Sequence, residues 1–93
     1  MTGSNIVPNV VVWRNIQVVA LDNLRNRVNK LLPDMMAMAV RMQLADIQTR
    51  VGYVRTEVDL RKRKGYAAAV KEDISAWQHE VEILEIRMGK VEN

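Results

Sequence analysis

The sequence contains no cysteine and no phenylalanine, and it has one histidine, two prolines and four glycines among 93 residues. The lack of cysteine excludes a disulfide scaffold, a thiol nucleophile and any zinc or iron–sulfur site with cysteine ligands. Because aromatic residues are only 4% and apolar residues 48% of the chain, any core must consist mainly of aliphatic side chains. With 27% charged residues, this composition is typical of a globular chain rather than a disordered one.

The chain is also short and mildly charged. A single core usually takes roughly 100–150 residues, so we expect residues 1–93 to form one helical domain. The net charge of +3 is too small to indicate a nucleic-acid partner by itself. Its apolar runs are shorter than the ~20 residues of a membrane span, and the first is not preceded by basic residues, as in a secretory signal. We therefore expect no transmembrane span, no signal peptide, and a place in the cytoplasm or in a macromolecular assembly.

Two prolines and one glycine divide the chain into three predicted helices. Pro8 suits the first turn of a helix, and Pro33 disfavours helical geometry at the residue before it. Gly65 follows a basic run at residues 61–64 and can adopt the left-handed conformation that ends many helices. The sequence therefore predicts helices at about 9–31, 34–62 and 66–91.

The second and third predicted helices carry apolar residues at alternating spacings of three and four. One series is Ala37, Val40, Leu44, Ile47, Val51, Val54 and Val58, and the other is Ala67, Val70, Ile74, Trp77, Val81, Leu84, Met88 and Val91. This heptad pattern packs a narrow apolar stripe against a partner helix. An antiparallel hairpin that turns near Gly65 matches the two series layer by layer, with Ile47 opposite Val81. We therefore predict an all-α fold: a coiled-coil-like antiparallel helical hairpin with a third, N-terminal helix, as a three-helix bundle or an oligomeric helical assembly.

The apolar residues outside this seam indicate an interface. Residues 10–21 are apolar on almost every side, and such a helix is normally buried, either by its own chain or by another subunit. Methionine and isoleucine residues also lie off the seam at the open base of the hairpin, and contiguous apolar patches usually mark interfaces. The predicted protein interface consists of Val12, Ile16, Val19, Met35, Met38, Met42, Ile83 and Ile86.

The basic run at the predicted hairpin tip is the only concentrated group of charges. It could contact the phosphates of a nucleic acid without reading its sequence, or it could be a solvated loop. The possible nucleic-acid contacts are Arg61, Lys62, Arg63 and Lys64.

Residues suited to catalysis or metal binding are scarce. His79 and Glu82 share a helix face, but a metal site takes more ligands than these two, and no serine or threonine stands in a triad-like pattern. We therefore expect no enzyme activity, catalytic residue, cofactor or metal. The predicted function is a structural or interaction subunit that oligomerises, or docks on a larger assembly, through the apolar N-terminal helix and the Met/Ile-rich base. The alternative is a small nucleic-acid-associated protein that uses the basic tip.

Overall fold

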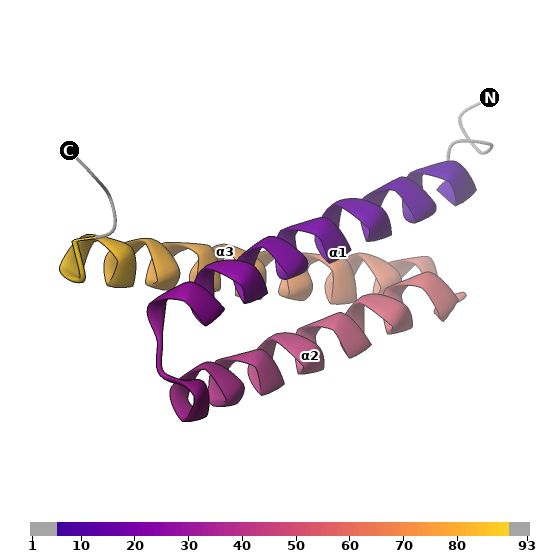
Figure 1. Ribbon diagram of the computed structural model, residues 1–93. Helices are drawn as coiled ribbons and strands as arrows, with labels where there is room; N and C mark the ends of the chain where they lie inside the picture. The colour runs from indigo at the N-terminus through magenta and orange to yellow at the C-terminus, as the bar shows by residue number, and fades with distance from the viewer. Residues whose placement is uncertain (1–5, 90–93) are drawn as a thin grey trace.

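The computed structural model describes the backbone of residues 6–89, and the side chains from Val10 onward, as three consecutive helices. These are α1 (Ile6–Leu31), α2 (Asp34–Thr56) and α3 (Leu60–Arg87). α2 runs antiparallel to α1, and α3 returns in the direction of α1 (Figure 1). Each helix contacts the other two, and residues 6–89 contain no strand. The predicted all-α class is confirmed, and the fold is a three-helix bundle.

The connection between α1 and α2 lies where the sequence predicts it. α1 ends with Leu31, and the Leu32 amide donates to the Val28 carbonyl oxygen at 3.0 Å. Pro33 then has an extended backbone, with φ −60° and ψ 157°, and acts as the N-cap of α2. Its carbonyl oxygen accepts the amide of Ala37 at 2.8 Å. The restriction that proline places on the preceding residue accounts for this break.

The connection between α2 and α3 lies at residues 57–59, so the predicted boundaries at 62 and 66 are wrong. Asp59 caps α3, because its carboxylate accepts the amides of Arg61 and Lys62 at 2.9 and 3.3 Å. Aspartate is among the strongest N-cap residues, and here it starts the helix six residues before Gly65. Gly65 therefore lies inside α3 rather than in the turn.

Moving the turn also displaces the pairing of α2 with α3 by roughly one helical turn. Arg50 forms an ion pair with Asp73 at 2.7 Å, and Ile47 lines a groove together with Asp73 and Trp77. The predicted pairing of Ile47 with Val81 is therefore wrong. Val58, which was expected in the seam, is 86% exposed in the turn.

The core lies between the inner faces of the three helices and still consists of aliphatic side chains. α1 contributes only residues of its C-terminal half, which pack against both other helices of the same chain. The buried apolar residues are Leu21, Leu24, Val28, Leu31, Ala37, Leu44, Ile47, Val51, Val54, Val70, Ile74 and Val81.

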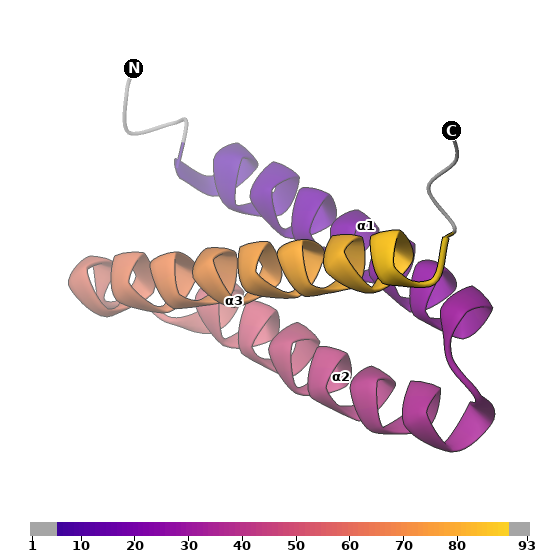
Figure 2. The ribbon, with the colours of Figure 1, turned by 90° about the vertical axis from the view of Figure 1, so that its left-hand side faces the viewer.

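The bundle is elongated because its helices have 23 to 28 residues, and it widens where α1 diverges from the other two helices toward its N-terminus (Figure 2). Its radius of gyration is 15.3 Å, whereas a compact domain of this length has about 12 Å. We call the end with the α1–α2 connection the base and the end with the α2–α3 connection the tip. The divergence of α1 leaves side chains at the tip uncovered.

Candidate interaction surfaces

Val12, Ile16 and Val19 form an exposed row that runs from the N-terminal half of α1 to its middle, and we call this row the α1 stripe. Their exposed fractions are 55%, 58% and 66%, and their spacing of four and three places them on one helix face. Together with Asn15 they line a shallow groove of about 330 Å³. Within the part of the chain that the structure describes, this apolar face of α1 is therefore open to solvent.

The predicted Met/Ile group lies at the base, where α2 begins and α3 ends (Figure 1). Met35, Met38 and Met42 of α2 are 84%, 54% and 68% exposed, and Ile86 of α3 is 60% exposed. Ile83 is half-buried. Because the α1 stripe lies in the half of α1 that approaches the tip, the structure does not bring the two predicted surfaces together.

The basic run forms the first turn of α3 instead of a hairpin loop. Arg61, Lys62 and Lys64 are exposed, whereas Arg63 is half-buried. The Nε and Nη2 atoms of Arg63 donate to the carbonyl oxygen of Glu57 at 2.9 and 2.6 Å. One of the four predicted phosphate contacts is thus used to hold the turn.

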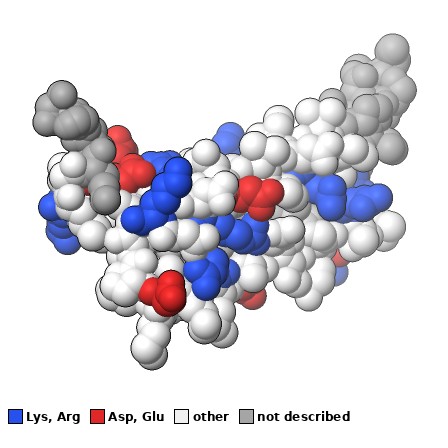
Figure 3. All heavy atoms as spheres, in the orientation of Figure 1, with Lys and Arg blue, Asp and Glu red and all other residues white. Residues whose placement is uncertain are grey.

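Four cations at a helix N-terminus oppose the helix dipole, which favours negative charge there. The Asp59 carboxylate counters them and occupies the amides of Arg61 and Lys62. An anion at this end would consequently be bound by side chains rather than by these amides. On the face shown in Figure 3, basic side chains are spread along the whole molecule, with acidic ones and broad uncharged areas among them.

Arg27 and Glu85 join α1 to α3 at the base. The guanidinium donates to both carboxylate oxygens, from Nε at 2.9 Å and from Nη2 at 2.7 Å. These hydrogen bonds lower the pKa of Glu85 below its ordinary value and raise that of Arg27. The pair fixes the C-terminal half of α1 against α3.

A groove at the tip joins α1 to the basic run, and the sequence pattern did not indicate it. It is lined by Val10, Trp13, Val54, Leu60, Arg63, Lys64 and Ala67, and we call it the tip groove. Its residues are far apart in the sequence, and only the packing of α1 beside the α2–α3 turn brings them together. The sequence offered no signal for this placement.

Residues suited to catalysis or metal binding are scarce among those that the structure describes. His79 is exposed, and residues 6–89 contain no cluster of three or more histidine, aspartate or glutamate side chains that could hold a metal ion. None of the helices α1, α2 and α3 is long and apolar enough to cross a membrane.

The fold and these surfaces define a small three-helix bundle with uncovered apolar side chains at both ends. Comparison with known proteins finds no family model, no curated protein and no solved structure that matches the chain. The function must therefore be inferred from the chemistry of the surfaces themselves.

Proposed function

We propose that the protein is a structural or interaction subunit that binds other protein surfaces, first of all further copies of itself. The α1 stripe is the observation that carries this proposal. Three β-branched or aliphatic side chains, each more than half exposed, stand side by side on one helix. Contiguous exposed apolar side chains usually mark an interface, and small domains commonly gain stability by oligomerising.

The side chains of the stripe suit the packing of one helix against another. Valine and isoleucine are stiff at χ1, so ordering them in an interface costs little conformational entropy. Asn15 is the polar neighbour within the stripe, and it carries no charge that would repel a second copy. A stable interface buries about 800 Å² on each partner, more than three side chains supply, so we expect the stripe to be the centre of a wider contact.

The Met/Ile group offers a second surface at the opposite end. Methionine side chains are flexible and polarizable, which suits contacts with partners of varied shape. Two separate apolar surfaces at opposite ends would let one subunit contact two neighbours. This arrangement supports membership of a larger assembly as well as simple self-association.

The test is the molar mass in solution, measured by light scattering as a function of protein concentration. We expect the mass of the wild-type protein to rise with concentration, and Val12→Glu combined with Val19→Glu to lower it while the helix content stays unchanged. The matched control is Ser75→Glu combined with Gln78→Glu, which adds the same charge at exposed positions of α3. A wild-type protein that stays monomeric at high micromolar concentration contradicts self-association through the stripe.

The alternative function, binding to nucleic-acid phosphates by the basic run, has less support. Arg61, Lys62 and Lys64 remain exposed within a single turn, but Arg63 is held by Glu57. Its signature would be an affinity for DNA or RNA that falls steeply with salt concentration. A pure assembly subunit would show no such affinity.

A further inference from the structure

The tip groove combines apolar walls with two cations. Its volume is about 480 Å³, which lies within the range of roughly 300–1,000 Å³ that is usual for small-molecule sites. The walls come from all three helices: Val10 and Trp13 of α1, Val54 of α2, and Leu60 and Ala67 of α3. One chain thus supplies all the described lining residues, and none of them belongs to the α1 stripe.

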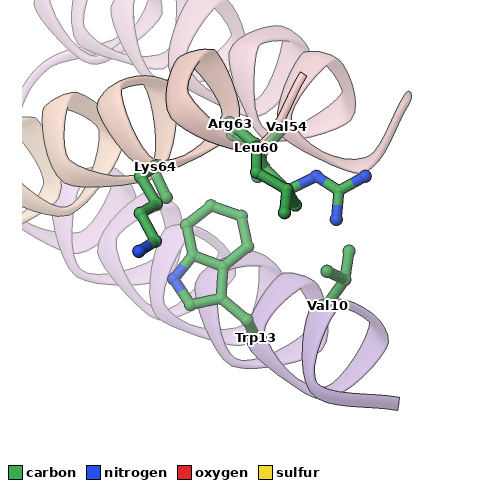
Figure 4. Close-up of a pocket in the computed structure, with 7 residues that line it drawn as sticks. Val10, Trp13, Val54, Leu60, Arg63 and Lys64 are labelled. Carbon is green, nitrogen blue, oxygen red and sulfur yellow. The ribbon is translucent and has the colours of Figure 1, made fainter. Parts of the chain in front are cut away.

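The polar groups of the groove lie at its edges (Figure 4). The indole nitrogen of Trp13 points to the side on which the Lys64 ammonium lies. Both groups are hydrogen-bond donors without an acceptor function. Arg63 lies at another edge, where the carbonyl oxygen of Glu57 holds its guanidinium in place. No acidic side chain is among the lining residues, so the groove presents positive charge and donors around an apolar floor.

We propose that the tip groove binds a single-chain anionic amphiphile, such as a long-chain carboxylate. The alkyl chain lies against Val54, Leu60 and Ala67, where it removes apolar surface from water. The anionic head lies between the Lys64 ammonium and the indole N–H of Trp13, and it accepts charge-assisted hydrogen bonds there. This binding activity is separate from the proposed interaction role, because it needs neither the α1 stripe nor a second copy.

The groove is too small to enclose two turns of a protein helix. Two turns of helix, about 10 Å wide and 11 Å long, occupy about 850 Å³, whereas the groove holds about 480 Å³. A flexible chain with one charged end matches both the volume and the distribution of charge.

The two tryptophans allow a direct binding measurement. In Trp77→Phe the only remaining tryptophan is Trp13, which lines the groove. We expect titration with dodecanoate, below its micellar concentration, to shift the Trp13 emission to shorter wavelength in a saturable manner, with one molecule bound per chain. In Trp13→Phe, where Trp77 is the only reporter, the same titration should leave the emission unchanged. A saturable shift in Trp13→Phe, or none in Trp77→Phe, overturns the proposal.

Two further ligands and two lysine variants separate the contribution of the anionic head to binding from that of the alkyl chain. Dodecyltrimethylammonium has an alkyl chain of nearly the same length with the opposite charge, and hexanoate has the same head with a shorter chain; both should bind at least tenfold more weakly than dodecanoate. Lys64→Gln should weaken dodecanoate binding about five- to tenfold, the effect of losing one charge-assisted hydrogen bond. Lys62→Gln, at an exposed lysine of the same turn that does not line the groove, should leave the affinity unchanged.

Other occupants give distinguishable results. Equal affinity for the cationic amphiphile, or equal losses in the two lysine variants, overturns the proposed head position. A response to anionic lipid vesicles without a response to free dodecanoate would indicate a membrane surface instead. Trp13 emission that depends on protein concentration even in Val12→Glu combined with Val19→Glu, without amphiphile, would mean that a second copy fills the groove and would overturn the proposal. Val12→Glu combined with Val19→Glu should bind dodecanoate as the wild type does, whatever happens to self-association.

Discussion

The base and the tip of the bundle differ in how firmly they hold the same helix. At the base, Leu21, Leu24 and Val28 of α1 are at most 1% exposed, and Arg27 is tied to Glu85 of α3. At the tip, α1 diverges (Figure 2), and the apolar residues that line the tip groove there, Val10 and Trp13, are only half-buried. One helix is thus part of the core in its second half and largely a surface in its first.

Hydrophobicity alone does not produce this difference, since the exposed half of α1 is the more apolar one. In residues 21–31 the apolar side chains recur at spacings of three and four, with polar residues between them, so they form one stripe that the hairpin can cover. In residues 10–19 apolar side chains point in nearly every direction. Whichever face packs against the hairpin, another is left outside.

The largest expected effect on stability comes from introducing an aspartate into each half of α1 and comparing the two variants. Val28→Asp should lower the free energy of unfolding by about 3 kcal/mol or more, because it buries an unpaired carboxylate at a fully buried position. Val12→Asp should change it by less than about 0.5 kcal/mol, since this side chain is 55% exposed. Urea unfolding followed by circular dichroism, at low protein concentration, measures both.

If Val28→Asp does not fold at all, Val28→Ala provides the measurement, with an expected loss of roughly 2 kcal/mol. Similar losses at positions 12 and 28 would contradict the distinction between the two halves.

A smaller effect, of opposite sign, tests the turn at the tip. Gly65 lies within α3, and an added Cβ would meet no atom within 4 Å. Gly65→Ala should therefore raise the free energy of unfolding by roughly 0.5–1 kcal/mol, the difference in helix propensity between the two residues. If residue 65 ended a helix in the left-handed conformation, alanine would be destabilising instead. A loss of stability in thermal or urea unfolding would instead support a turn at Gly65, as the sequence predicts.

The smallest effect concerns the ion pair at the base. Glu85→Gln should cost at most about 1 kcal/mol at pH 7, because the Arg27 and Glu85 side chains are 32% and 20% exposed. Since Arg27 lowers the pKa of Glu85, this contribution is complete above the ordinary glutamate pKa of about 4.3 and is lost as the pH falls through the lowered value. The wild type and the variant should thus converge in unfolding experiments as the pH falls below the lowered pKa of Glu85. Glu72→Gln, at an exposed glutamate of the same helix, is the control, and a loss of equal size there would assign the effect to net charge.

Local signals in the sequence predicted much of this fold. The aliphatic core, the number of helices and the break at Pro33 follow from spacing and from the geometry of proline. The second turn was misplaced because two local signals competed: Gly65 can end a helix, but Asp59 can start one. Residues 61–64 favour helix in either case. The position of the turn determines which residues of α2 and α3 face each other. A misplaced turn therefore shifts the predicted pairs of facing residues.

Among the candidate surfaces, the sequence predicts the α1 stripe but not the tip groove. The exposure of Val12, Ile16 and Val19 could be expected, because residues left outside a helical seam have to face elsewhere. The tip groove could not be predicted from the sequence, because Trp13 and Lys64 are brought together only by the path of α1 along the hairpin. A long-range arrangement of this kind leaves no periodicity in the sequence.

The brevity of the two connections, residues 32–33 and 57–59, has a kinetic consequence. Helices that are consecutive in the chain pack side by side, so most contacts link residues that are near in sequence, and only those between α1 and α3 close a long loop. Proteins with such low contact order fold within microseconds to milliseconds. If the subunits assemble, we therefore expect the slow step to be their encounter, with a rate that depends on protein concentration, rather than the folding of each chain.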